Sequence, residues 1–306
     1  MADGTFVLYH YNPSAAAAII FVVLFAICTI LHLYKLVRFK TWHFIPFLIG
    51  CIFEAVGYAG RAVSANQTPN WTTMPYVIQS LLLLLGPTLL AASVYMTLGR
   101  LIILLEADSY AIIRPKRLTK FFVLGDVLSF LAQSGGGGML AQAKTQDKID
   151  LGEKVILVGL LIQILFFGFF MVVTLVFHRR IARDPTPQSL FITAPWMRYI
   201  YILYTASVFI MIRSVFRVAE YAGGYSGTLQ STEVYIYIFD ATLMFIVAAL
   251  FIIVHPSQII SKNKGALPLS ESEGYAENVP MNARKQEQGW DRPQGPRPYQ
   301  GAMGGY

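Results

Sequence analysis

The stretch Met211-Ile-Arg-Ser-Val-Phe-Arg-Val-Ala-Glu-Tyr-Ala-Gly223 places three charged residues inside an apolar run that extends from residue 199 to 222. As a helix, a run of this length crosses the hydrocarbon core of a bilayer. Helical residues are about 100° apart, so Arg217 lies about 40° round from Arg213, and Glu220 lies about 20° on the other side. A charge at mid-bilayer costs about 2.5–3.5 kcal/mol on insertion scales. The sequence therefore predicts partners for these three side chains.

The composition indicates a polytopic membrane protein. The 306 residues are 55% hydrophobic and only 13% charged, whereas a soluble chain is about 25% charged. The apolar residues come in blocks of about 20, the length of a spanning helix. The net charge of +7 comes from basic residues beside these blocks and not from one basic patch, so we expect no nucleic-acid partner.

Seven apolar blocks predict an all-α fold, a bundle of seven transmembrane helices within residues 15–256. The third block is longer than the hydrocarbon core and contains Pro87, so we expect it to tilt, kink or protrude. Residues 257–306 are rich in Pro, Gly, Gln, Ser and Glu, which predicts a disordered tail. The expected spans are about 15–34, 44–64, 75–105, 121–142, 155–177, 199–222 and 234–254.

Basic residues outside the spans predict the orientation. They divide 17 to 3 between the two sides, which places the N-terminal segment 1–14 outside and the tail in the cytosol. Two glycosylation sequons, at Asn66 and Asn70, fall in the expected outer loop between the second and third spans. That loop is only about ten residues long and Pro69 follows the first sequon, so we expect both to be unused.

Four acids and four bases lie in or at the edges of the spans, as expected for charges that compensate one another. Their depth separates a cytosolic-side polar pair, Arg100 and Asp126, from a group in the middle-to-outer half. We predict that Asp240 and Glu54 neutralise Arg213 and Arg217. The eight residues are Glu54, Arg61, Arg100, Asp126, Arg213, Arg217, Glu220 and Asp240.

Two amide side chains extend this predicted polar interior. Gln133 shares a face of the fourth span with Asp126, and Gln163 lies in the middle of the fifth. The glycines 135–138 that follow allow either close approach of helix backbones or unwinding beside a cavity, and we favour the close approach. The whole network either only fixes helix register or lines a pocket for a charged head group. Both alternatives stay open at the level of sequence.

Several motifs resemble the fungal lipid-translocating exporter family, the RTA-like proteins named for aminocholesterol resistance. The resemblance covers roughly residues 8–258, and one departure is Gly86-Pro87 where the family pattern has Ala-Pro. The motifs are Tyr11-Asn-Pro13, Glu54-x-x-Gly-Tyr-x-x-Arg61, Leu-Gly86-Pro-Thr-Leu-Leu-Ala-Ala-Ser-Val-Tyr95, Leu98-Gly-Arg100-Leu-Ile, Asp126-Val-Leu-Ser-Phe-Leu-Ala-Gln133, Gly159-Leu-x-x-Gln163, Ile212-Arg-Ser-Val-Phe-Arg-Val-Ala-Glu-Tyr221, and then Glu233, Tyr237, Asp240 and His255-Pro256.

The resemblance implies seven spans, a setting in the plasma membrane or another fungal membrane, and a role in lipid asymmetry, sphingoid-base release or resistance to amphiphilic drugs. The expected partners are membrane lipids: a sphingoid base, a phospholipid or a sterol-like amphiphile. An ammonium would suit Glu54 or Asp240, and a phosphate would suit Arg213 or Arg217. The chain has no G-x-x-x-x-G-K-S/T motif, so we expect translocation without ATP hydrolysis.

Two other functions are weighed against translocation. A lipid-sensing receptor or regulator of lipid asymmetry fits the seven-span form, although the third span ends Leu98-Gly-Arg-Leu, unlike G-protein-coupled receptors. An intramembrane lipid-modifying enzyme needs converging metal ligands. His32, His178 and His255 fall near the cytosolic edges of three spans, but no His-x-x-x-His spacing occurs. We therefore expect no enzyme activity, no metal and no cofactor.

Overall fold

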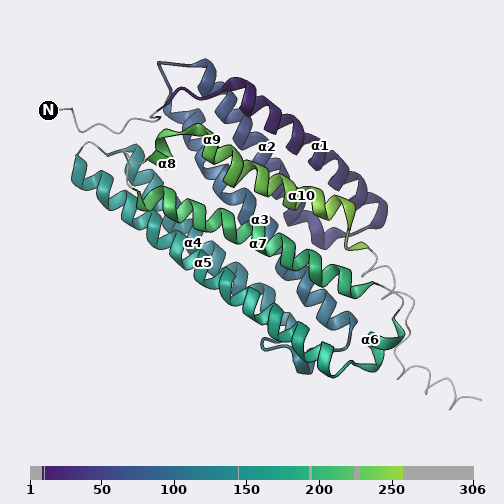
Figure 1. The fold of residues 1–306 in the computed structure, drawn as a ribbon. Helices are drawn as coiled ribbons and strands as arrows, with labels where there is room; N and C mark the ends of the chain where they lie inside the picture. The colour runs from purple at the N-terminus through teal and green to yellow at the C-terminus, as the bar shows by residue number, and fades with distance from the viewer. Residues whose placement is uncertain (1–8, 10, 144, 193–194, 224–227, 258–306) are drawn as a thin grey trace, which may run out of the picture. The chain divides into compact units, whose positions relative to one another are not determined.

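Helices cover every apolar block of the sequence in the computed structural model of this chain (Figure 1). The structure describes residues 9, 11–143, 145–192, 195–223 and 228–257. Within these ranges the chain forms helices and no β-strand, so the predicted all-α fold is confirmed. Apart from its first residue, the predicted disordered tail lies outside the described residues.

The first two helices begin and end at residues with recognisable capping roles. Helix α1 (Ala15–Phe39) begins where Ser14 Oγ accepts a hydrogen bond from a backbone N–H of the first turn. It ends at Lys40, whose φ of 53° is in the left-handed region. A short 3₁₀ turn, η1 (Trp42–Phe44), then leads into α2 (Ile45–Asn66).

Helix α3 (Thr73–Leu104) is the long third element that the sequence predicts, and it continues unbroken through Pro87. Its 32 residues correspond to about 48 Å at 1.5 Å per residue. Because this exceeds the ~30 Å of hydrocarbon in a bilayer, a part of the helix must tilt or protrude. The 3₁₀ turn η2 (Asp108–Tyr110) follows it.

Helices α4 (Pro115–Ala141) and α5 (Gln146–Arg183) pack closely because glycines face the contact. A Cβ added to Gly136 would lie 2.7 Å from the carbonyl oxygen of Gly152. A Cβ added to Gly159 would lie 2.8 Å from a carbonyl oxygen of α4. Larger side chains at these positions would separate the two backbones. The close approach predicted from the glycine run is therefore present at Gly136, within a helix that stays continuous.

The last part of the chain contains one long helix and a composite one. The composite helix runs from Glu233 to Ile253, and its π-helical portion, η3, interrupts the α-helical geometry. The elements are α6 (Pro187–Phe191), α7 (Trp196–Ala222), α8 (Thr228–Ser231), α9 (Glu233–Ile236), η3 (Tyr237–Thr242) and α10 (Leu243–Ile253).

The long helices contact one another in a closed order. In the sequence α1, α2, α3, α4, α5, α7, α10, each helix contacts the next, and α10 contacts α1. Helix α3 also contacts α7 across this ring. Helices α2, α4 and α7 end on the side where α1, α3, α5 and α9 begin (Figure 1). We call this side the α9 end and the opposite side the α6 end.

Burial in this bundle is typical of a protein in lipid. Arg61, Glu54 and Arg213 are buried, whereas many Ile, Leu and Val side chains are exposed. Helix α4 is not among the described helices that are long and apolar enough to cross a membrane, because its charged, amide and glycine residues lower its hydropathy. The chain is a multi-pass membrane protein, and the count of seven spans stays a prediction. The six qualifying segments are Ala15–Phe39, Trp42–Asn66, Thr73–Leu104, Gln146–Arg183, Trp196–Ala222 and Glu233–Ile253.

Candidate functional site

Arg213 of α7 and Asp240 of η3 form a buried ion pair. Arg213 Nε donates to Asp240 Oδ1 at 2.6 Å, and neither side chain is more than 3% exposed. Arg213 Nη2 donates to the main-chain carbonyl oxygen of Leu83 on α3 at 2.8 Å. A buried guanidinium is tolerated when it is both paired and hydrogen-bonded. The predicted pairing of Arg213 with Asp240 is thus present, and it joins three helical elements.

Pro87 explains why a carbonyl group of α3 is available to Arg213. In an α-helix each N–H donates to the carbonyl four residues earlier, and proline has no N–H. Pro87 therefore leaves the carbonyl of Leu83 without its helical donor. Arg213 supplies a donor from the neighbouring helix. The proline and the arginine, far apart in sequence, form one structural unit.

Asp240 lies in the π-helical segment η3. π-Helical turns are rare in proteins, and those that occur are frequently found at functional sites. Within η3, Thr242 Oγ1 donates to the main-chain oxygen of Tyr237, five residues earlier, at 2.8 Å. The segment presents Asp240 to Arg213 and Tyr237 to Arg61. One short stretch of chain therefore serves two buried arginines.

Arg217 pairs within its own helix, which corrects the prediction that Glu54 neutralises it. Arg217 Nη1 donates to Glu220 Oε2 at 2.8 Å. The guanidinium also lies 5.4 Å from the ring centroid of Tyr221. Residues three apart are neighbours on a helix surface. Glu220 is therefore a nearer partner than a carboxylate on another helix.

Glu54 of α2 is fully buried, and neither of its carboxyl oxygens makes a hydrogen bond with a residue that the structure describes. A Cβ added to Gly86 of α3 would lie 2.7 Å from Glu54 Oε1. The glycine that departs from the family pattern therefore provides the space for this carboxyl. Arg213, Arg217 and Asp240 interact with Glu54 electrostatically. Each of these three belongs to an ion pair that does not include Glu54.

Arg61, near the end of α2, is the centre of a second cluster. Its Nη2 donates to Glu233 Oε1 at 2.9 Å, and its Nε donates to Tyr237 Oη at 3.1 Å. Both carboxylate oxygens of Glu233 also accept the backbone N–H of Ser14, at 3.0 and 2.9 Å. Glu233 therefore joins the starts of α1 and α9 to α2. We call Arg61, Glu233, Ser14, Tyr11 and Tyr237 the Arg61 cluster.

Aromatic rings enclose the Arg61 guanidinium. The ring centroids of Tyr11 and Tyr237 lie 5.5 and 5.4 Å from its central carbon. Arg61 Nη2 donates to Tyr11 Oη at 2.5 Å. Burial raises the pKa of the Tyr11 hydroxyl, so this residue accepts the bond as a neutral phenol at neutral pH. Of the Arg61 cluster, the sequence predicts only Arg61 as a site residue. Glu233, Tyr11 and Tyr237 occur in the family motifs, and that occurrence was the signal that could have identified them.

The two predicted amides meet between α4 and α5. Gln133 Nε2 donates to Gln163 Oε1 at 3.2 Å and to Ser129 Oγ at 2.5 Å. Ser129 Oγ donates in turn to the carbonyl oxygen of Gly159 at 2.7 Å. This chain of hydrogen bonds lies at the close contact of the two helices. It is separate from the ion pairs of α7.

The structure does not bring the predicted polar pair together. Arg100 is exposed and forms no ion pair within the described ranges, whereas Asp126 is buried. Asp126 interacts electrostatically with Tyr95 of α3, and neither of its carboxyl oxygens makes a hydrogen bond with a described residue. Depth along the membrane does not determine the face of the helix on which Arg100 lies.

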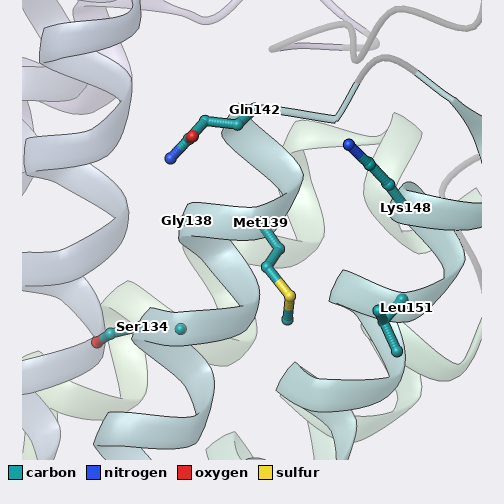
Figure 2. A pocket seen from close by; sticks show the side chains of 7 residues that line it. Ser134, Gly138, Met139, Gln142, Lys148 and Leu151 are labelled. Atoms are coloured by element: carbon teal, nitrogen blue, oxygen red, sulfur yellow. The ribbon is translucent and has the colours of Figure 1, made fainter.

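A pocket of about 500 Å³ opens between the end of α4 and the start of α5, at the α9 end (Figure 2). A Cβ added to Gly135 or Gly138 would have no neighbour within 4 Å, so these glycines leave the space open. Lys148 contributes one cationic group, and Met139 and Leu151 contribute apolar surface. The lining residues are Ser134, Gly135, Gly138, Met139, Gln142, Lys148 and Leu151.

Two smaller predictions concern sugars and metals. Asn66 and Asn70 are both exposed, in the connection between α2 and α3, and their use stays a prediction. Where the structure describes the chain, no group of three or more His, Cys, Asp or Glu residues is placed to hold a metal ion. The rings of His32 and His255 lie 6.5 Å apart at the α6 end, packed among phenylalanines.

The described polar interior thus contains three arginine–carboxylate pairs, one amide pair and two carboxyls, those of Glu54 and Asp126, without a hydrogen bond. In a medium of low dielectric constant, paired charges bind a charged ligand when the ligand replaces one partner. Two of the three pairs join different helices. Exchange of a partner would therefore change how those helices are held together.

Comparison with known proteins identifies relatives of this chain. The family described as RTA1 like protein matches residues 47–263. Protoporphyrin uptake protein 1 of Saccharomyces cerevisiae is 38% identical over 287 residues, which covers 81% of this chain and 92% of the relative. A lipid-translocating exporter-like protein of Leptosphaeria maculans is 30% identical over 272 residues, covering 81% and 51%. A sphingoid long-chain base transporter of Saccharomyces cerevisiae is 23% identical over 300 residues, covering 88% and 78%. No solved structure matches the chain.

Proposed function

This chain belongs to the RTA1-like protein family, and on that premise we propose that it translocates an amphiphilic lipid across a membrane without hydrolysing ATP. The names of its relatives support export of membrane lipids at the level of the family. The substrate proposed for this chain is a sphingoid base, a phospholipid or another amphiphile with a charged head group. The chain carries the lipid unchanged and is not an enzyme.

The proposed topology has seven spans, with the N-terminus outside and the C-terminal tail in the cytosol. Helix α4 supplies the additional span, and it packs between α3 and α5. The basic residues outside the spans support this orientation. The plasma membrane is the proposed location. In this orientation the α9 end faces the exterior, with the Arg61 cluster and the α4–α5 pocket.

The observation that carries the proposal is the presence of three arginine–carboxylate pairs, one buried and two partly buried, in helices of membrane-spanning length. Ionisable groups within a bilayer are rare, and they typically mark pathways for ions or polar substrates. An apolar core would hold these helices together without the desolvation cost of a buried pair. We therefore assign the pairs to the recognition of a head group that enters from the α9 end.

The chemistry of the pairs defines the classes of head group. An ammonium group would compete with Arg213 for Asp240, and a phosphate would compete with Asp240 for Arg213. The acyl chain would remain beside the exposed apolar surface of the helices. Because one relative is named for protoporphyrin uptake, a porphyrin carboxylate is a further anionic group that would compete with Asp240 for Arg213.

Flux through reconstituted protein tests the proposal. Purified chain in phospholipid vesicles is compared with protein-free vesicles for movement of a fluorescent sphingoid base, a fluorescent phospholipid and protoporphyrin. We expect protein-dependent movement of at least one of the three, with the lipid recovered chemically unchanged by mass spectrometry. Equal rates in both kinds of vesicle for all three would refute translocation, and chemical conversion of the lipid would show an enzyme.

A further inference from the structure

Unlike the other charged groups near it, the carboxyl of Glu54 belongs to no ion pair in the part of the chain that the structure describes. Its side chain is 0% exposed and makes no hydrogen bond with a described residue. It packs against the backbone of α3 at Gly86, where even a Cβ would lie 2.7 Å from Oε1. Water is therefore excluded from one side of the carboxyl by direct contact between two helices. An ionised carboxylate in such a place is strongly destabilised.

The nearby cations are already engaged. Helix α7 presents Arg213, which holds Asp240, and Arg217, which holds Glu220. The segment η3 presents Asp240, a second negative charge. On its own helix, Glu54 has only Cys51 and Tyr58 as titratable neighbours. Within the described part of the chain, the charges around Glu54 therefore balance without it.

Size restricts the ligand that this arrangement can take. A hydrated metal ion or an organic cation would need space between α2 and α3, where Glu54 now contacts Gly86. A proton needs no space. It neutralises the carboxyl and leaves the balance of the three ion pairs unchanged. The packing therefore favours a protonated Glu54 as long as the two helices remain together.

From this geometry we infer that Glu54 is a proton-binding site, and that its proton is exchanged for the cationic head group of a transported amphiphile. When α2 and α3 move apart at Gly86 and the head group enters, the O–H bond of Glu54 breaks, the proton leaves to water, and the carboxylate pairs with the quaternary or primary ammonium. One positive charge leaves as one enters, so the buried charge stays constant. The exchange half of this inference rests on the proposed function, and the protonation half does not.

Infrared spectroscopy tests the protonation directly. A protonated carboxyl has a C=O stretching band that is separate from the carboxylate bands and shifts in D2O. We expect this band in purified protein at neutral pH, and we expect it to weaken in Glu54→Gln. Asp126→Asn is the matched control, because Asp126 is the other buried carboxyl without a hydrogen bond. In this control the Glu54 component should remain.

A wild-type protein without the band, or a band that Glu54→Gln leaves at full strength, would overturn the inference. Far-UV circular dichroism checks that the variant is folded. If Glu54→Gln does not fold, Glu54→Asp replaces it, since a carboxyl shortened by one methylene should absorb at a changed frequency. An unchanged frequency in Glu54→Asp would equally overturn the inference.

Transport under a pH gradient tests the exchange. The probe is a fluorescent long-chain quaternary ammonium amphiphile, whose fixed charge prevents passive trapping by the gradient. With vesicles one pH unit more acidic inside, exchange of one proton per cation corresponds to about tenfold accumulation, the factor for 1.36 kcal/mol. We expect this in wild type and a ratio of about one in Glu54→Gln and in protein-free vesicles.

The two failures are distinguishable. Probe movement in wild type that is indifferent to the gradient, or accumulation that Glu54→Gln retains, overturns exchange at Glu54 and leaves translocation intact. A wild-type protein that moves neither this probe nor the three lipids overturns the proposed function. In that case the infrared band alone decides whether Glu54 binds a proton.

Discussion

At the scale of residues, the most informative contact is the one that Arg213 makes with two acceptors of different origin. Asp240 provides a charge, and Leu83 provides a main-chain oxygen that Pro87 leaves without a helical donor. Loss of the guanidinium would leave both acceptors buried without a partner. The arrangement therefore makes stability and head-group recognition depend on the same side chain.

Replacing Arg213 with methionine is expected to destabilise the protein by about 3–5 kcal/mol, because the charge of Asp240 is then buried alone. The double variant Arg213→Met/Asp240→Leu should recover part of this loss, since it removes the unpaired charge and leaves only the Leu83 carbonyl. Denaturant unfolding in detergent micelles, followed by circular dichroism, measures both. A single variant within about 0.5 kcal/mol of wild type, the range of ordinary surface substitutions, would contradict this account.

Gly86 is the second residue-scale test. Alanine at this position would place its Cβ 2.7 Å from Glu54 Oε1, and overpacking of this kind costs about 1–3 kcal/mol. Gly135→Ala is the matched control, because a Cβ there meets nothing within 4 Å and alanine is favoured in a helix by up to about 1 kcal/mol. In thermal unfolding, the midpoint temperature should be higher for Gly135→Ala than for wild type and lower for Gly86→Ala. Removing the carboxyl with Glu54→Ala should restore the stability that the Gly86→Ala variant loses through this contact.

At the scale of elements, Glu233 holds three helices at the α9 end. Its carboxylate accepts hydrogen bonds from Arg61 on α2 and from the backbone of Ser14, the N-cap of α1. It is also the first residue of α9. A single carboxylate thus fixes the relative positions of elements that are distant in sequence.

Glu233→Gln is expected to weaken these contacts selectively. Loss of the charge should cost about 1–3 kcal/mol, because charge-assisted hydrogen bonds to Arg61 and Ser14 become neutral ones. Hydrogen exchange of the amides in the first turn of α1 should accelerate, whereas exchange in the middle of α5 should not change. Uniform acceleration in both helices would show that Glu233 has no special role at this end.

Sequence patterns predicted the elements well and the partners in part. Apolar runs located the helices because a bilayer imposes a fixed length on them. Depth along the helix predicted the pairing of Arg213 with Asp240. It missed the pairing of Arg217 with Glu220, which depends on a local i,i+3 contact, and it overlooked Glu233, just outside an apolar run. The face of a helix that is buried depends on its neighbours, and for this reason the Arg100–Asp126 pair was wrong.

At the scale of the whole molecule, topology is tested by placing cysteines on either side of α4. Cys28 and Cys51 are buried, so a new exposed cysteine should dominate labelling by an impermeant maleimide. Lys116 and Lys148 are exposed, before and after the glycine-rich part of α4. With α4 as a span and the N-terminus outside, Lys148→Cys is labelled on intact cells and Lys116→Cys only after permeabilisation. Labelling of both on intact cells would show that α4 does not cross the membrane.

The central claim is that the buried ion pairs recognise the head group of a translocated lipid. The most direct measurement is the flux of fluorescent lipid in vesicles that contain Arg213→Gln/Asp240→Asn, compared with wild type at equal protein content. The double variant replaces both charged side chains with neutral amides, so no charge is left unpaired. Our account predicts retained helical content with flux reduced by about tenfold or more, equivalent to ~1.4 kcal/mol. A folded double variant that moves lipid at the wild-type rate would contradict it.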